Sequence, residues 1–233
     1  MAKYRFYIPA LLTLGNVYNL NEAQAKHAVQ VLRLTVNSVI EIVNGNGILA
    51  TAIITQTGKK TCSILVNAIE TFLPALSKVH IAISPLKNVS RLEWFLEKAT
   101  EIGVAAITPI ICNRTEKENL RTDRLQQIIT SAMLQSKQMY MPVLNNAIAF
   151  NTFISHTKLN HTHYLIAHCE VDTKTQITNY RHKNTTIIIG PEGDFTTTEI
   201  EAANHANFIN VSLGINRLRT ETAGIVAATA LII

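Results

Sequence analysis

The sequence has 233 residues, of which 47% are hydrophobic and 16% are charged. This composition excludes a disordered, collagen-like or coiled-coil chain, and it predicts a well-filled core in one or two domains. The net charge of +5 favours a polyanionic partner without establishing one. Three cysteines without a Cys-x-x-Cys pair predict free thiols in a reducing compartment rather than a disulfide framework.

No apolar run reaches the roughly 18 residues that a membrane span needs. The longest run, at 223–233, is interrupted by Thr229 and is predicted to be a buried terminal helix. The stretch 8–14 has the character of a secretory signal, but it is short for one and contains Pro9. We therefore predict a cytoplasmic protein with no membrane partner.

The first 73 residues are predicted to form a small β-barrel. Alternation in the first strand puts Lys3 and Arg5 on one face and apolar side chains on the other. The run from Asn44 to Gly47 predicts a hairpin, because Asn-Gly tolerates the positive φ of tight turns. The expected elements are strands at 3–7, 39–43, 48–54 and 62–68, with a helix at 22–32. We place the domain boundary at Leu73-Pro74, between a domain of residues 1–73 and one of residues 74–233.

From residue 79 the pattern changes to alternating strands and helices. This order predicts an α/β domain with a mostly parallel sheet, in which the continuously apolar run 79–84 is buried on both faces. A capping box at 90–93 is expected to open a helix that ends at Gly103. The other expected elements are strands at 105–111, 164–167, 185–189 and 208–213, and helices at 122–137, from 196 and from 220.

Three loops that follow predicted strands carry unusual residues. They are His168-Cys169-Glu170, Gly190-Pro191-Glu192-Gly193 and the segment 214–222. Ligands of open α/β sheets bind beyond the carboxyl ends of the strands, and glycines let the backbone approach a ligand closely. Each loop alone fits an ordinary strand-to-helix turn, but the three together favour a binding site.

The common nucleotide and hydrolase motifs are missing from the sequence. It contains no Gly-x-Gly-x-x-Gly after a strand, no phosphate-binding P-loop and no Gly-x-Ser-x-Gly. His161, His163, His168 and Cys169 lie close together, but no second ligand pair stands at a spacing typical of zinc sites. We therefore expect no metal.

Two C-terminal motifs resemble those of the SPOUT class of RNA methyltransferases. They are Gly190-Pro191-Glu192-Gly193 and Leu218-Arg219-Thr220-Glu221-Thr222-Ala223, the latter preceded by Leu213-Gly214. The similarity is greatest to the family of small-subunit 16S ribosomal RNA uridine-N3 methyltransferases, RsmE. Arg5-Phe6, Val31-Leu32-Arg33 and the run from Glu93 to Gly103 also agree, so the resemblance spans nearly the whole chain.

The resemblance implies a PUA-like barrel, followed by a SPOUT domain with a deep trefoil knot that acts as a homodimer. It also implies that the three loops hold S-adenosylmethionine as methyl donor. The residues that it assigns to methyl-donor binding are Ala167, Ile189, Gly190, Pro191, Glu192, Gly193, Leu213, Gly214, Leu218 and Thr222. Two positions depart from the family pattern: Asp194, where many members have glycine, and Gln138, where arginine is common.

The implied reaction transfers a methyl group to N3 of a uridine in small-subunit ribosomal RNA, either free or in the assembled subunit. Uracil N3 carries a proton that titrates well above neutrality, so a preorganised cation that stabilises the uracil anion would assist the transfer. The catalytic candidates are Arg5, Arg217 and Arg219, and no metal is required. The candidates for contacts with RNA are Lys3, Arg5, Arg114 and Lys137.

Two other function classes remain open on the sequence. One is a non-catalytic RNA-binding factor for ribosome assembly that keeps the fold, and the other is a metabolic α/β enzyme with a different adenine-containing ligand. Binding of S-adenosylhomocysteine in the micromolar range is expected only of the methyltransferase, so this measurement separates the classes.

Overall fold

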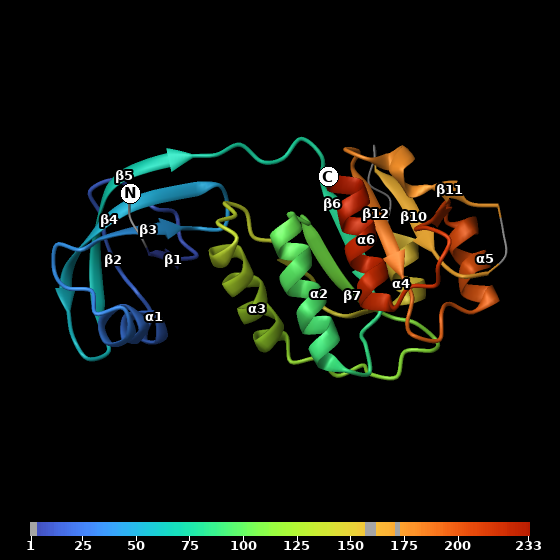
Figure 1. The fold of residues 1–233 in the computed structure, drawn as a ribbon, viewed down its shortest axis with the longest axis horizontal. Coiled ribbons are helices and arrows are strands. Elements are labelled where there is room, and N and C mark those ends of the chain that lie inside the picture. Colours follow the sequence, from blue (N-terminus) through green and yellow to red (C-terminus); the bar gives the residue numbers. More distant parts are fainter. Residues whose placement is uncertain (1–3, 157–161, 171–172) are drawn as a thin grey trace. The chain divides into compact units, whose positions relative to one another are not determined.

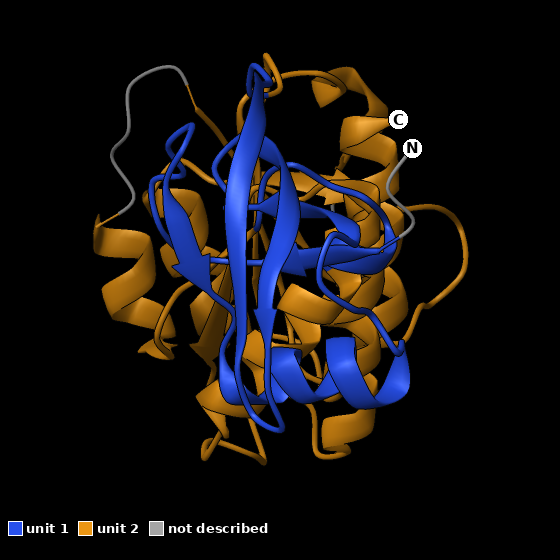
Figure 2. Ribbon diagram, turned by 90° about the vertical axis from the view of Figure 1, so that its left-hand side faces the viewer, with its two compact units in different colours: residues 1–74, 133–141 blue, residues 75–132, 142–233 orange. Residues whose placement is uncertain are grey.

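The computed structural model describes residues 4–156, 162–170 and 173–233, and the chain divides into two compact units (Figures 1 and 2). Unit 1 comprises Met1–Pro74 and Met133–Met141, and unit 2 comprises Ala75–Ala132 and Pro142–Ile233. Segment 133–141 lies far along the chain from the rest of unit 1. It is nevertheless joined to it by backbone hydrogen bonds, from Gly47 N to Met139 O and from Met141 N to Gly45 O, both 2.9 Å.

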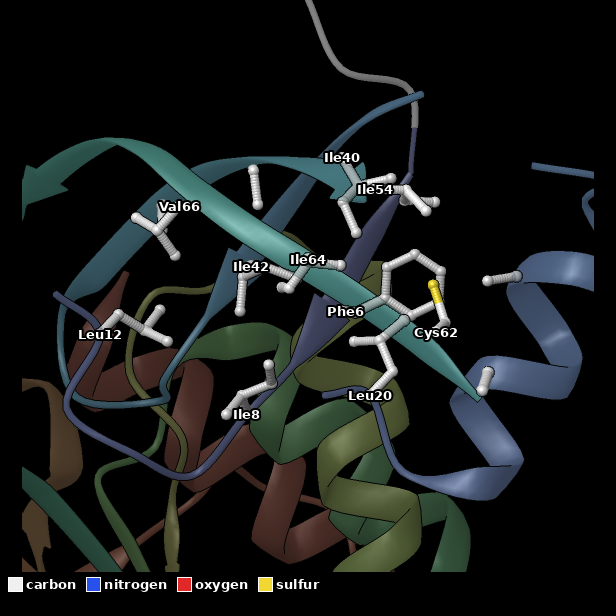
Figure 3. Close-up of a cluster of buried hydrophobic side chains, with 14 residues drawn as sticks. Phe6, Ile8, Leu12, Leu20, Ile40, Ile42, Ile54, Cys62, Ile64 and Val66 are labelled. Carbon is white, nitrogen blue, oxygen red and sulfur yellow. The ribbon is translucent and has the colours of Figure 1, made fainter. Parts of the chain in front are cut away.

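Unit 1 is built on a five-stranded curled sheet in the order β1-β3-β4-β5-β2. Its strands are β1 (Arg5–Tyr7), β2 (Val17–Asn19), β3 (Val39–Val43), β4 (Ile48–Thr57) and β5 (Cys62–Thr71). The predicted hairpin is confirmed: β3 and β4 pair antiparallel, and Gly45 and Gly47 have φ values of 73° and 85°. The side chains that point inward from every second position, among them Phe6, Ile42 and Ile64, form a buried core (Figure 3).

The helix predicted at 22–32 is divided into two parts. α1 (Glu22–Lys26) is capped by Asn21, whose side chain accepts a hydrogen bond from Gln24 N. A π-helical turn, η1 (His27–Val31), follows α1 directly. Ala25 and Ala28 are completely buried, so the small side chains let this segment pack closely against the sheet core.

Unit 2 is an α/β domain whose described strands all pair parallel, in the order β11-β13-β10-β12-β6-β7-β8 with β9 beside β7. The strands are β6 (Val79–Ile83), β7 (Ala106–Ile111), β8 (Val143–Leu144), β9 (Ile148–Ala149), β10 (His163–Ala167), β11 (Thr175–Gln176), β12 (Thr185–Ile189) and β13 (Ile209–Ser212). β6 and β12, which are buried along almost their whole length, are neighbours inside the sheet, as expected for strands covered on both faces. The predicted mostly parallel α/β domain is confirmed.

The helices of unit 2 lie on the two faces of this sheet (Figure 1). They are α2 (Val89–Ile102), α3 (Thr122–Gln135, whose last turn belongs to unit 1), α4 (Phe150–His156), the 3₁₀ turn η2 (Ile177–Tyr180), α5 (Thr197–His205) and α6 (Thr220–Ile232). α2 and α6 contact each other, and α6 also contacts β6 and β12. Side chains of α4 and α5 form a separate buried cluster with Ala82, Ile166 and Ile188 of the strands.

The helix ends confirm one predicted capping box and correct another. Thr196 and Glu199 form a capping box at the start of α5, and Gly103 ends α2 with a φ of 98°. The box predicted at 90–93 is wrong, because α2 begins at Val89 and its cap is Asn88, whose side chain accepts from Ser90 N at 3.0 Å. Asparagine is as good a cap as serine, so Asn88 can start the helix two residues before Ser90.

Several short elements were not expected from the sequence: β2, β8, β9, α4, β11 and η2. They contain two to seven residues, too few for a hydrophobic period to stand out. The trefoil knot stays a prediction of the resemblance. No helix in the described parts of the chain is long and apolar enough to cross a membrane.

Candidate functional site

The three predicted loops come together in unit 2 at one pocket of about 790 Å³. β13, β10 and β12 are adjacent in the sheet and parallel, so their carboxyl ends lie at the same edge. Eight of the ten residues predicted to bind the methyl donor line the pocket: Ala167, Ile189, Gly190, Pro191, Glu192, Leu213, Gly214 and Leu218.

The other two predicted residues, Gly193 and Thr222, are not among the lining residues. A Cβ atom on Gly193 would lie 3.2 Å from Cδ of Arg114. Thr222 lies within the first turn of α6, where its neighbours Thr220 and Ala223 line the pocket. Any effect of Gly193 on a bound ligand would therefore pass through Arg114 or through the loop itself.

Two glycines of the lining are required by geometry. Gly214 has a φ of 134°, in the region that L side chains rarely adopt. Gly190 leaves little room for a side chain, because its Cβ would lie 3.0 Å from the ring of Phe195, which is 1% exposed. The Gly190 carbonyl accepts a hydrogen bond of 3.0 Å from the buried Thr220 hydroxyl, which ties the second loop to the start of α6.

Charged side chains fix the other walls of the pocket. Lys174 Nζ donates to the carbonyl oxygens of His168 and Glu170, both at 2.7 Å, and so holds the first loop. Glu192 accepts a hydrogen bond of 3.1 Å from the backbone amide of Lys87. The Lys174 contacts thus hold the loop after β10 from within, and the Glu192 contact joins the loop after β12 to the segment before α2.

Sequence reasoning missed several lining residues, notably Cys169, Lys174 and Ile215. Cys169 and Ile215 lie within loops that the sequence predicts to bind a ligand, whereas no sequence pattern indicates a role for Lys174. Burial and the nearby Asp194 carboxylate raise the pKa of the Cys169 thiol, and this effect outweighs the opposing charges of Arg217 and Lys174. The thiol is therefore protonated at neutral pH and is a poor nucleophile.

The four candidate arginines differ in what they bind. Arg217 and Arg219 line the pocket and are exposed, and their side chains make no hydrogen bond or ion pair within the described part of the chain. Arg114 donates from Nη1 to Gly193 O at 2.6 Å and to Phe195 O at 3.3 Å. Arg5, in unit 1, pairs with Glu41 of the adjacent strand at 2.8 Å, and its side chain is only 10% exposed.

The remaining RNA-binding candidates are placed as follows. Lys137 is exposed and belongs to unit 1 with a φ of 58°, whereas Arg114 belongs to unit 2. Lys3 lies outside the described residues, as does His161 of the histidine cluster. His163 packs its ring against Tyr180, with centroids 5.2 Å apart. In the described residues no three His, Cys, Asp or Glu side chains gather in a way that could hold a metal ion.

The pocket suits an organic ligand the size of a nucleoside derivative. Its volume falls in the range of small-molecule sites, and its walls combine apolar side chains, exposed backbone and free guanidinium groups. The glycine backbone can approach a flat ring, and the guanidinium groups can pair with a carboxylate or another anion. The Cys169 thiol is protonated, so the arrangement favours binding and orienting reactants.

Two family models match the chain. The model of an RNA methyltransferase domain matches residues 74–232, and the model of an RNA methyltransferase PUA domain matches residues 20–67. Between them they cover most of the chain.

Individual relatives agree with these matches. The chain is 29% identical over 229 residues to the ribosomal RNA small subunit methyltransferase E of Rickettsia conorii, covering 96% of this chain and 92% of the relative. It is similar to the crystal structure of a probable rRNA-methyltransferase from Porphyromonas gingivalis, with 34% identity, a TM-score of 0.88, and 97% and 95% of the two chains covered. It is also similar to a ribosomal RNA small subunit methyltransferase E from Neisseria gonorrhoeae bound to S-adenosyl methionine, with 28% identity, a TM-score of 0.87, and 97% and 95% covered.

Proposed function

The chain belongs to the ribosomal RNA small subunit methyltransferase E family, and from that premise we propose that it methylates N3 of a uridine in 16S ribosomal RNA. The methyl donor is S-adenosylmethionine. The observation that carries the proposal is the single pocket formed by the loops after β10, β12 and β13, with both resemblance motifs in its walls.

The pocket residues fit the methyl donor. The backbone of Gly190, Leu213 and Gly214 would hold the adenine, and the exposed guanidinium groups of Arg217 and Arg219 offer partners for its carboxylate. The bound donor supplies a methyl group on a positively charged sulfur that is a good leaving group. The work left to the protein is to orient the reactants and to stabilise charge.

Arg217 and Arg219 are the best placed of the catalytic candidates. A guanidinium near uracil O2 or O4 favours the anion that forms as the N3 proton leaves. Both arginines lie in the pocket wall without a protein partner among the described residues, so their charge is available. Arg114 and Arg5 are already bound to carbonyl groups and to Glu41, respectively.

We also propose that Arg5 contacts RNA. Substitution of either partner in its ion pair with Glu41 can test this role. Its Nη1 atom is buried without a hydrogen-bond partner among the described residues, although Nε and Nη2 bind Glu41. If Arg5 only holds the sheet together, Arg5→Ala and Glu41→Gln should lower stability equally and leave methylation intact. If Arg5 contacts RNA, only Arg5→Ala should weaken binding of small-subunit RNA. Lys3, Arg114 and Lys137 remain proposed RNA contacts.

The active protein is proposed to be a homodimer that acts in the cytoplasm on small-subunit RNA or the assembled subunit. α6 is apolar around most of its circumference, yet its buried residues lie mainly on the face toward α2 and the sheet. Val226 and Ala230 remain partly accessible, and Ile233 is 67% exposed. A second copy of the chain would cover this apolar face. The three free cysteines suit a reducing compartment.

The function is tested by methyl transfer from labelled S-adenosylmethionine to free 16S RNA and to small subunits from cells that lack this protein. Digestion and mass mapping of the nucleosides should reveal 3-methyluridine at one position. Arg217→Ala and Arg219→Ala should lower turnover with RNA saturating, whereas Arg121→Ala, an exposed arginine of the same unit outside the pocket, should not. RNA binding without transfer to either substrate would favour the assembly factor, and methylation of another base atom would overturn the N3 assignment.

A further inference from the structure

Asp194 occupies an unusual backbone position in the wall of the pocket. It ends a tight turn in which its amide donates to Pro191 O at 2.9 Å, and its φ is +63°. This left-handed conformation costs a residue with a Cβ more than it costs glycine, although aspartate tolerates it better than most. The turn alone would therefore be served better by glycine, and something else favours the carboxylate.

The carboxylate of Asp194 joins two of the three pocket loops. Its Oδ2 accepts a hydrogen bond of 2.7 Å from the backbone amide of Cys169, which belongs to the loop after β10. Its Oδ1 accepts one of 2.8 Å from the amide of Phe195, in its own loop after β12. Hydrogen bonds from amides to an ionised carboxylate are stronger than those between neutral groups. Both oxygens are thus used to hold backbone in place.

The two loops are held from their other sides as well. Arg114 binds the carbonyl groups of Gly193 and Phe195, and Lys174 binds the carbonyl groups of His168 and Glu170. Asp194 adds a side-chain hydrogen bond that joins one of these loops to the other. Without it, each loop would still be attached to its own neighbours, but beyond the paired ends of β10 and β12, at Ala167 and Ile189, this tie between the two loops would be lost.

We propose that Asp194 is a positioning residue for methyl-donor binding: its carboxylate sets the spacing of the loops at 168–170 and 190–196 before the donor arrives. This proposal rests on the proposed function, because the pocket must bind the donor for the spacing to matter. A pocket that is already in its bound shape avoids the cost of ordering its loops on binding. Loss of the carboxylate should therefore weaken binding rather than slow the transfer step.

Three substitutions separate this role from that of a turn residue. Asp194→Gly relieves the backbone strain and removes both hydrogen bonds, whereas Asp194→Asn tolerates the same φ and keeps one acceptor. Asn207→Gly is the matched control, because Asn207 also has a positive φ, of 66°, in the exposed turn before β13 and outside the pocket. All three should leave the melting temperature close to that of the wild type.

The first measurement is amide hydrogen exchange in the ligand-free protein. The Cys169 amide should be protected in the wild type and in Asn207→Gly, and should exchange at least about tenfold faster in Asp194→Gly. Unchanged exchange at Cys169 would overturn the proposal. This result does not depend on the donor, so it stands even if the proposed function fails.

The second measurement is calorimetry with S-adenosylmethionine and S-adenosylhomocysteine. Both affinities should fall together, by at least about tenfold in Asp194→Gly and less in Asp194→Asn, with kcat at saturating donor little changed. Wild-type affinities in Asp194→Gly would overturn the positioning role. A loss confined to the cationic donor would also overturn it, since the carboxylate would then act through its charge. A wild-type protein that binds neither ligand would refute the proposed function, whatever the exchange result.

Discussion

The candidate arginines of this protein differ in whether their side chains already bind another group of the chain. Arg5 and Arg114 carry full charges, but each is bound by groups of its own unit, Glu41 in one case and two carbonyl oxygens in the other. Arg217 and Arg219 have no such partner in the part of the chain that the structure describes. An unpaired guanidinium in a partly enclosed pocket has the strongest field for a substrate, so these two arginines are the first targets for mutation.

Gly193→Val should weaken binding of S-adenosylhomocysteine by about tenfold, or about 1.4 kcal/mol, while the protein stays folded. The new side chain meets the flexible stem of Arg114 at 3.2 Å, in an exposed loop, and displaces the guanidinium that holds Gly193 O and Phe195 O. Calorimetry and thermal melting check the two parts of this prediction. Gly190→Ala is the contrasting variant: its Cβ would press on the buried Phe195 ring, so it should lower stability by about 1–3 kcal/mol.

Affinity for S-adenosylhomocysteine equal to that of the wild type in folded Gly193→Val would show that this part of the loop does not influence the pocket.

His80 should make the protein less stable in mild acid. Burial lowers the pKa of His80 from 6.5 to about 4, and the imidazole pairs through Nε2 with Thr108 Oγ1 at 2.7 Å. His80 binds a proton more readily in the unfolded state than in the folded state. The free energy of unfolding is therefore unaffected by His80 above about pH 6.5, and it decreases as the pH falls to about 4. The free energy of unfolding should drop by up to about 3 kcal/mol over this interval.

Urea unfolding of the wild type and of His80→Gln at several pH values checks this prediction, since the carboxylates titrate alike in both proteins. A difference between the two that does not change with pH would contradict it.

At the scale of elements, close packing of α2 against α6 depends on the one glycine inside α6. A Cβ on Gly224 would lie 2.5 Å from Cε2 of Phe95 and 3.2 Å from Cδ1 of Ile83, and both of these side chains are completely buried. α6 begins at the pocket, with Thr220 bound to Gly190 O, so the helix contact and the pocket are continuous. The glycine therefore fixes how closely the helix that carries the pocket residues approaches the sheet.

Gly224→Ala should destabilise the protein by about 1–3 kcal/mol, because Phe95 has no space into which to move. This cost should exceed the gain of up to about 1 kcal/mol that alanine brings to a helix. Thr229→Ala, at an exposed position of the same helix, should change stability by no more than about 0.5 kcal/mol. Urea unfolding compares the two, and a Gly224→Ala protein as stable as the wild type would show that the helices can separate without cost.

At the scale of the whole molecule, oligomerisation is the main untested expectation. If α6 is covered by a second copy, the protein should sediment as a dimer at micromolar concentration. Val226→Glu should produce a folded monomer, because a charge on this partly accessible face opposes burial. Asn204→Glu, an exposed change on α5, should leave the dimer intact. A wild-type protein that methylates RNA as a monomer would contradict the proposed assembly.

Much of the architecture follows from local pattern. The alternation of 39–43 and 48–54, the apolar runs of β6 and β12, and the helical spacing of α3 are each visible within a few residues. The shortest elements, such as β8, β9 and α4, are not predicted from the sequence, because they form only where longer neighbours provide a strand edge or an apolar face. Similarly, segment 133–141 joins unit 1 through hydrogen bonds to Gly45 and Gly47, which no local pattern announces.

The sequence by itself determined the α/β class, the strand-rich beginning and the three loops on which ligand binding depends, because periodicity and turn residues act over short distances. Only the tertiary structure decided that those loops meet, since the order β13-β10-β12 places segments 168–170, 190–196 and 213–219 at one edge of the sheet. It also decided which charges are free: the partners of Arg5 and Arg114 lie 36 and 79 residues away along the chain. Whether a side chain is paired depends on residues that folding brings to it, and sequence spacing alone does not contain that information.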